Sequence, residues 1–309
     1  MRTLNQTLLI AAAGRDVEAV RRAGLQCLHL CAALSESGQF SVLSHPLCAA
    51  GDLLGIVDRG GLPSSPAAFA ASACRLAQTR RAAGILIDFQ REELADCAAA
   101  LDEQTAQAGL SLWVPRELTS HTPHAVCIAE TGISGGSLTA YFAELSDQYG
   151  GRVAAQLVRS CARFSIPSRS VCGTPLTLEQ AMRLREETGA SVFFSRELCA
   201  KYFTYMHHGS AYFVLFDDDD TMRKKQEVLS AAGISRQLLL YPDAAVLGVL
   251  NRSKKAPQSQ SGCFADCNSV TRAWFRPLQG IHACRHCRPG SVRRAEASYG
   301  TADSARIKS

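Results

Sequence analysis

The stretch that decides the fold is Gly84-Ile85-Leu86-Ile87-Asp88-Phe89-Gln90. Side chains alternate along a β-strand, so Leu86, Asp88 and Gln90 share one face and the three bulky apolar residues between them share the other. In a closed barrel, we expect the apolar face to pack outward against helices and the Leu/Asp/Gln face to point into the lumen. The inward residues become more polar toward the carboxyl end of the strand, which is where barrel active sites are built.

Short apolar runs of this kind alternate with amphipathic helical patterns over residues 1–250, which is typical of a parallel sheet built from βα units. Eight runs are predicted as strands, the number in a (β/α)8 TIM-type barrel: Thr7–Ala13, Gln26–Ala32, Leu53–Asp58, Gly84–Phe89, Ser111–Pro115, Ala125–Glu130, Arg152–Val158 and Gln237–Tyr241. The predicted helices are Asp16–Ala23, Ser65–Arg81, Glu92–Ala108, Leu138–Tyr149, Leu178–Thr188 and Asp220–Ala232.

One aromatic insertion interrupts the alternation. Ser191–Arg196 and Lys201–Asp217 have the pattern of extended segments, and the polar turn His207-His208-Gly209-Ser210 lies within the second. We therefore predict a small β-hairpin before the last helix and strand. Its aromatic residues fit either packing of a small subdomain over the barrel rim or stacking against sugar rings, and both interpretations remain open here.

The charge is unevenly distributed along the chain. The 309 residues are 47% hydrophobic and 20% charged, with a formal net charge of +5. Lys and Arg greatly outnumber Asp and Glu after residue 250, whereas the preceding part is close to neutral, so no specific nucleic-acid partner is expected. No segment approaches the ~20 apolar residues that span a bilayer, so no membrane partner is expected either. The apolar start is predicted as a strand rather than a secretion signal, which favours a cytoplasmic location and reduced thiols.

Residues 251–309 are predicted as a basic tail that contains two pairs of cysteines. Cys263 and Cys267 are followed by Cys284 and Cys287, which could hold zinc tetrahedrally. The surrounding composition, rich in Ser, Arg, Gly and Ala, is also typical of a disordered segment. Both interpretations stay open, and we predict no metal or cofactor in the barrel itself.

Three segments, taken in order, resemble glycoside hydrolase family 18, and most closely its branch of spore-associated and cell-wall N-acetylglucosaminidases. The stretch 83–90 is similar to the fourth strand of that family, written D-x-x-D-x-D-x-E. Phe203-Thr204-Tyr205 through Phe213–Asp218 is similar to the branch's Y-T-x…H-V-V-W-F-E-D segment. Lys224 through Gly233-Ile234 to Leu238–Tyr241 is similar to its final helix and strand. The resemblance covers residues 1–250 and implies the same barrel, with a degenerate catalytic motif.

In active members of that family the terminal Glu protonates the leaving-group oxygen, while the substrate's own N-acetyl group acts as nucleophile. The Asp two residues earlier holds that acetamide. Carried over by position, Asp88 keeps the orienting role, but the acid position is Gln90, and the outer Asp positions are Ala83 and Leu86. An amide has no proton to transfer at neutral pH, so the resemblance implies impaired hydrolysis with glycan binding still chemically possible.

The resemblance implies further site residues and leaves three functions open. Glu130, at the end of the sixth predicted strand, is the best substitute acid, although it fits equally a rim carboxylate or a helix-capping partner. Tyr205 and Tyr241 are the expected substrate-binding aromatics. The expected partner is a glycan or glycopeptide, with a spore association implied by the resemblance, and the oligomeric state is not predicted. The alternatives are an active glycosidase that uses Glu130 and a non-catalytic structural or interaction barrel.

The run Asp217-Asp218-Asp219-Asp220 invites a calcium interpretation. It lacks the spaced oxygen ligands and the Gly of a calcium loop. We therefore expect the end of a strand followed by a helix N-cap.

Overall fold

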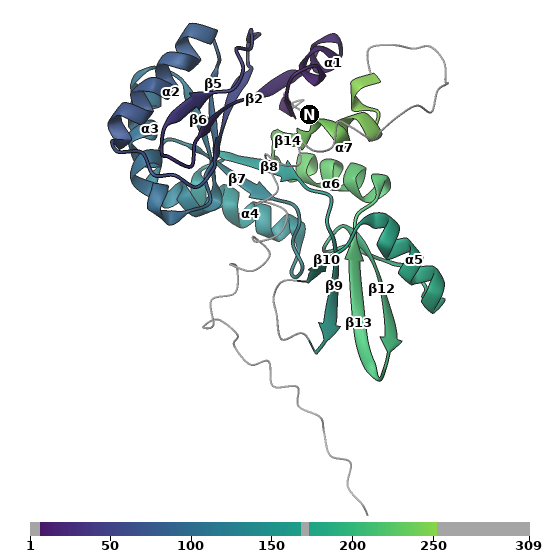
Figure 1. The fold of residues 1–309 in the computed structure, drawn as a ribbon. Helices are drawn as coiled ribbons and strands as arrows, with labels where there is room; N and C mark the ends of the chain where they lie inside the picture. The colour runs from purple at the N-terminus through teal and green to yellow at the C-terminus, as the bar shows by residue number, and fades with distance from the viewer. Residues whose placement is uncertain (1–6, 168–172, 252–309) are drawn as a thin grey trace, which may run out of the picture.

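The computed structural model describes residues 7–167 and 173–251, and most of this chain forms a closed barrel of parallel strands surrounded by helices (Figure 1). Closure occurs at the first strand, because Ile10 lies opposite Leu239 of the last strand on one side and Cys27 of the second on the other. The predicted (β/α)8 barrel is therefore confirmed. Its eight strands are β1 (Thr7–Ala12), β2 (Gln26–Leu34), β4 (Leu53–Asp58), β5 (Gly84–Asp88), β6 (Ser111–Pro115), β7 (Val126–Glu130), β8 (Val153–Leu157) and β14 (Arg236–Leu240).

Helices cover most of the outer wall. They are α1 (Asp16–Arg22), α2 (Pro66–Arg80), α3 (Ala95–Gln107), α4 (Leu138–Tyr149), α6 (Asp219–Ala231) and α7 (Tyr241–Val246), with 3-10 turns η1 (Glu92–Leu94), η2 (Arg116–His121) and η3 (Val249–Asn251). Two connections between barrel strands lack an α-helix. Between β6 and β7 there is only η2, and between β2 and β4 there is a short antiparallel strand, β3 (Phe40–Val42), followed by an irregular segment. β3 was not predicted.

The core confirms the alternation expected for the fourth strand. Leu86 lies in the lumen cluster, packed with side chains from other strands such as Trp113. Ile85, Ile87 and Phe89 instead pack outward in the cluster formed with α2 and α3. A side chain at Gly84 would meet the backbone of the neighbouring strand, because an added Cβ would lie 2.1 Å from the Ser111 carbonyl oxygen. Glycine at the start of β5 therefore permits the close approach of β6.

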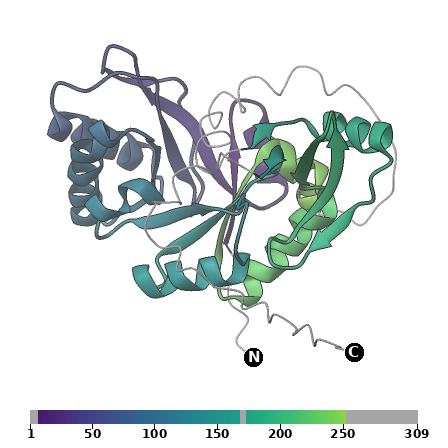
Figure 2. The same cartoon turned by 90° about the horizontal axis from the view of Figure 1, so that it is seen from below.

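A second sheet lies beside the barrel rim, at the carboxyl end of β8 (Figure 2). The predicted hairpin is confirmed as its centre and the predicted extended segment 191–196 as one of its edges, but two further strands and one helix belong to it. Its order is β10-β9-β13-β12-β11, and its elements are β9 (Cys161–Ile166), β10 (Thr174–Pro175), α5 (Leu178–Thr188), β11 (Phe193–Ser195), β12 (Ala200–His207) and β13 (Ser210–Phe216). Apolar residues of α5 pack on one face of this sheet against Phe203, Val214 and Phe216. The predicted helix 178–188 thus covers the small sheet rather than the barrel.

The helix ends follow the local sequence. The Thr177 hydroxyl accepts a hydrogen bond from the Gln180 backbone N–H at 3.1 Å, and the Gln180 side chain accepts one from Thr177 N–H at 2.8 Å, which is a capping box. Gly189 and Gly233 end α5 and α6 with positive φ, as predicted. In the described part of the chain, no helix has the length and apolar character to cross a membrane. The predicted tail, with Cys263, Cys267, Cys284 and Cys287, lies outside the described residues apart from Asn251.

Candidate functional site

The two central predicted residues meet at the carboxyl end of β5. Asp88 is the last residue of the strand and is 6% exposed, and Gln90 follows half-buried. The Gln90 Nε2 donates a hydrogen bond to Asp88 Oδ1 at 3.3 Å. Active sites of such barrels are built at the carboxyl ends of the strands, so the pair lies where a catalytic site is expected.

The chain after Gln90 is held by a bidentate ion pair. Arg91 Nε and Nη2 donate to Asp58 Oδ2 and Oδ1 at 2.7 and 2.9 Å, and Nη2 also donates to the Gly61 carbonyl oxygen at 2.7 Å. The Asp58 contact raises the pKa of Arg91 above its usual value. Asp58 ends β4, so this clamp joins the carboxyl ends of two adjacent strands beside Gln90. This ion pair was not predicted from the sequence, because Asp58 and Arg91 are 33 residues apart in the chain.

Glu130 lies at the same edge but on another strand. It is the last residue of β7 and half-buried, and β6 separates its strand from that of Asp88. In the register of β7 with β8, Glu130 lies opposite Gln156, which is 3% exposed. Gln156 is two residues after Ala154, which belongs to the lumen cluster, so its side chain lies on the same, inward face of the strand. Gln156 was not predicted as a site residue, although a single Gln within the apolar run 153–157 indicates a polar group inside the barrel.

The two predicted substrate-binding tyrosines lie apart from each other. Tyr205 is on β12, 8% exposed, in the core between α5 and the small sheet, where its ring stacks on Tyr212 at 5.2 Å between centroids. Tyr241 was expected to end the last strand, but it begins α7 directly after β14, and it packs partly buried against the outer cluster of the barrel. Sugar binding by either residue stays a prediction.

The acidic run 217–220 forms the expected strand end and helix N-cap. The Asp218 carboxylate accepts from Thr221 N–H at 3.1 Å and caps α6. Asp217 pairs with Lys225 at 2.6 Å, and Asp220 with Arg223 at 3.4 Å. Asp219 also has a protein partner, Arg159, so each of the four carboxylates is paired.

Asp219 belongs to a charged group at the ends of β8 and β14. Arg159 donates to Asp219 Oδ1 at 2.9 Å through Nη2 and to Asp243 Oδ1 at 3.0 Å through Nε. Burial alone would lower the pKa of Arg159, but these two carboxylates raise it above its usual value. The group ties the start of α6 to α7 at the rim.

This rim carries carboxylates and amides at the ends of several strands, and such groups can form hydrogen bonds with hydroxyl and amide groups. Gln90 can donate a hydrogen bond to a glycosidic oxygen but cannot protonate it. In the described residues, metal-ligating side chains close enough to share one ion are found at His29, Cys48 and Asp52, and these lie away from Asp88 on a different part of the barrel.

The fold is similar to that of several solved structures. The spore cortex-lytic enzyme SleL of Bacillus megaterium superposes with a TM-score of 0.52 at 10% identity, covering 79% of this chain and 74% of that one. A glycoside hydrolase family 18 N-acetylglucosaminidase from Paenibacillus barengoltzii gives 0.52 at 13% identity, covering 80% and 98%. The chain has the barrel fold of these structures. SleL of Bacillus cereus gives 0.52 at 10% identity, covering 82% and 76%.

At the level of sequence, neither a protein-family model nor a curated protein matches the chain. At identities of 10–13%, the structural likeness establishes the fold and leaves the chemistry to the residues at the rim.

Proposed function

We propose that this barrel binds N-acetylglucosamine-containing glycans, such as peptidoglycan or chito-oligosaccharide, and hydrolyses them poorly or not at all. The observation that carries the proposal is the Asp88–Gln90 hydrogen bond at the carboxyl end of β5. Asp88 supplies a carboxylate that can accept the N–H of an acetamido group. Gln90, as its neighbour, can hold a glycosidic oxygen without donating a proton to it.

The loss of hydrolysis follows from the acid position. General acid catalysis typically contributes about 10²–10⁴-fold to a rate, and the Gln90 side chain has no proton that it can give up at neutral pH. By the resemblance to family 18, we expect the leaving-group acid at this position. Another carboxylate would have to reach the same oxygen to restore the reaction, and Glu130 is the candidate at this edge of the barrel.

The ligand class is supported by the fold neighbours. One is a family 18 N-acetylglucosaminidase and two are spore cortex-lytic enzymes. By analogy with them, we expect a polymer of bacterial wall or spore cortex, or a chito-oligosaccharide, as the partner of this chain.

Calorimetric titration of the full chain with tetra-N-acetylchitotetraose and with muropeptides tests the binding. We expect saturable binding that weakens at least tenfold in Asp88→Ala. Asp96→Ala, which removes an exposed carboxylate from α3, is the matched control and should bind as the unaltered protein does. Equal binding by both variants would contradict the proposed site.

A chromogenic chitobioside separates the proposal from its alternatives. We expect little or no turnover by the unaltered chain. Robust turnover abolished by Glu130→Ala would instead establish an active glycosidase with a relocated acid. Absence of both binding and turnover would favour a structural or interaction barrel, a role that the 6% exposure of Asp88 also fits.

A further inference from the structure

The outer wall of the barrel at β2 carries a second group of reactive side chains. The connection from β2 to β4 has no helix, and the irregular segment 43–52 covers this part of the wall instead. His29 of β2 and Asp52, the residue before β4, are hydrogen-bonded to each other, and Cys48 lies beside them. His29 alternates with Leu28 and Leu30 of the lumen cluster, so it faces away from the lumen.

The spacing of the three side chains is close to that of a metal site. One ligand atom from each residue lies within 4.8 Å of the other two, and the His29 Nε2 to Asp52 Oδ2 distance is 2.8 Å. Imidazole nitrogen, thiolate sulfur and carboxylate oxygen are the ligands that Zn²⁺ takes in proteins. Cys48 is in an irregular segment, which can move its sulfur the remaining distance more easily than a strand could.

His29 has an unused ring nitrogen. The side chain is 1% exposed, and in the described part of the chain its Nδ1 has no hydrogen-bond partner. Buried polar atoms are normally paired, so an orphaned imidazole nitrogen needs an explanation. Asp52 is 2% exposed and is fixed in place, since its Oδ1 accepts from Cys27 N–H at 2.9 Å and its Oδ2 from Ala49 N–H at 2.8 Å.

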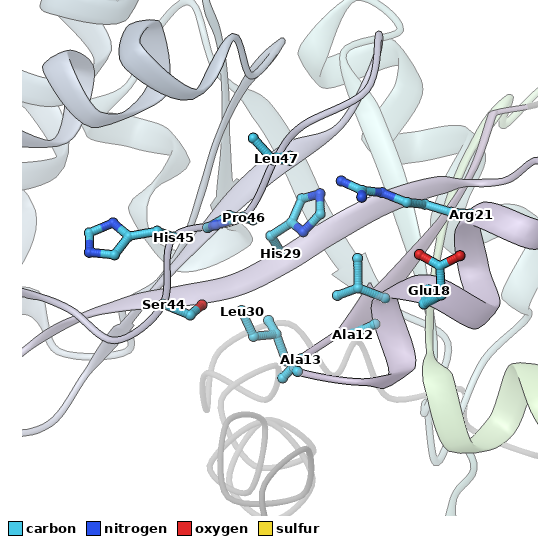
Figure 3. A pocket seen from close by; sticks show the side chains of 12 residues that line it. Ala12, Ala13, Glu18, Arg21, His29, Leu30, Ser44, His45, Pro46 and Leu47 are labelled. Atoms are coloured by element: carbon cyan, nitrogen blue, oxygen red, sulfur yellow. The ribbon is translucent and has the colours of Figure 1, made fainter.

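A cavity reaches this group at His29. It has a volume of about 370 Å³ and is lined by His29 together with residues from the end of β1, from α1 and from the segment 44–47. Figure 3 shows His29 between Arg21 of α1 and the segment that carries Ser44 and His45. The space is ample for an ion with a bound water, because one water occupies roughly 30 Å³ in the liquid.

We propose that His29, Cys48 and Asp52 form a Zn²⁺ site on the outer wall of the barrel, with a water from the cavity as the fourth ligand. The ion takes the place of the hydrogen on His29 Nε2, and that hydrogen moves to Nδ1, the ring nitrogen that is buried without a hydrogen-bond partner in the described residues. The Cys48 thiol loses its proton to solvent, so the thiolate and the Asp52 carboxylate together balance the charge of the ion.

The free protein holds Cys48 in the thiol form. Burial, with a further contribution from Asp52, raises the pKa of Cys48 to about 11. Metal binding must therefore displace one proton, and the affinity should rise with pH through the neutral range.

Cobalt spectroscopy on the full chain tests the proposal, because a thiolate ligand gives Co²⁺ an intense charge-transfer band. The four tail cysteines, Cys263, Cys267, Cys284 and Cys287, are first replaced by Ser so that the tail cannot contribute. We expect one Co²⁺ per chain, displaced by Zn²⁺, with the band lost in Cys48→Ser and the affinity reduced at least tenfold in His29→Gln. Cys74→Ser, which alters a buried thiol on α2, is the control.

Alkylation of the unaltered chain gives a measurement that needs no variant. Cys48 and Cys161 are both half-buried thiols with a pKa raised to about 11. We expect Zn²⁺ to slow the alkylation of Cys48 at least tenfold and to leave that of Cys161 unchanged. No Co²⁺ band, a band that survives in Cys48→Ser, or equal protection of both thiols would each overturn the proposal.

Discussion

Replacing Lys225 by Met should destabilise the protein strongly, because it leaves a buried carboxylate without its cation. Lys225 is 1% exposed and Asp217 is 0% exposed, and their Nζ and Oδ2 atoms are 2.6 Å apart. Removal of one partner of such a pair costs about 3–5 kcal/mol. Asp217 keeps hydrogen bonds from Thr221 Oγ1 and from Ser160 N–H, both at 2.9 Å, so we expect about 3 kcal/mol, at the lower end of that range.

Thermal unfolding followed by circular dichroism measures this loss. In a domain of this size, each kcal/mol lost from the free energy of unfolding lowers the midpoint temperature of unfolding by about 2–4 °C. Lys225→Met should therefore lower that midpoint by about 6–12 °C. The double variant Asp217→Leu/Lys225→Met removes both charges, and such replacements of buried pairs are often neutral. We therefore expect it to recover most of the midpoint.

An exposed ion pair provides the matched control. Arg183 and Glu179 are 3.2 Å apart on α5 with side chains 68% and 83% exposed. Arg183→Met should cost no more than about 0.5 kcal/mol, as for other pairs on a helix surface. A Lys225→Met variant that loses no more than this control, or a double variant less stable than Lys225→Met, would refute the reasoning from the buried charge.

Three further outcomes are expected. Gln90→Glu restores a proton donor beside Asp88 and should raise chitobioside turnover at least about 100-fold above the unaltered chain in a spectrophotometric assay, and an unchanged rate would argue against Gln90 as the missing acid. Gly84→Ala drives a methyl group toward the Ser111 carbonyl oxygen and should cost at least about 1–3 kcal/mol in urea unfolding, whereas no loss would contradict the close approach of β5 and β6. Burial acts to raise the pKa of Asp52, but hydrogen bonds from His29 and two backbone N–H groups hold it below its usual value, so its contribution to stability is present above pH ~4 and is lost as pH falls through the lowered pKa. Asp52→Asn should therefore be less stable at pH 7 in urea unfolding and should lose less stability on acidification, and parallel pH profiles would contradict this.

The sequence predicted the barrel because its strands carry local patterns. In the run 84–90 the period of two was enough to assign Leu86 and Asp88 to the lumen and Phe89 to the outer wall, and the structure agrees. The hairpin β12/β13 was found for a similar reason, because its polar turn separates two aromatic runs.

The missed features depend on partners that are distant in the chain. Residues 161–166 were not predicted as a strand, although Ala162, Phe164 and Ile166 alternate with polar residues. The strand that they pair with, β13, begins only at Ser210. The contact of His29 with Asp52 spans 23 residues and follows from the path of an irregular segment that no periodicity describes. At the candidate site, the Asp88–Gln90 contact was accessible to local reasoning, whereas the pairing of Glu130 with Gln156 required the register of two strands.

The chain passes from the barrel into the small sheet at Ser160 and returns to the barrel at Asp217, and these two residues lie side by side. Asp217 N–H donates to the Ser160 carbonyl oxygen at 2.7 Å, and Ser160 N–H donates to Asp217 Oδ2 at 2.9 Å, so the residues that flank β9 and β13 touch each other. Because its entry and exit points adjoin, a short linker between them could replace the module without opening the barrel, at the cost of the contacts that Glu197 and Cys199 make with the barrel. The barrel can thus keep its closure while the module over its rim is shortened, enlarged or exchanged, and the module offers a natural place to graft a new recognition surface.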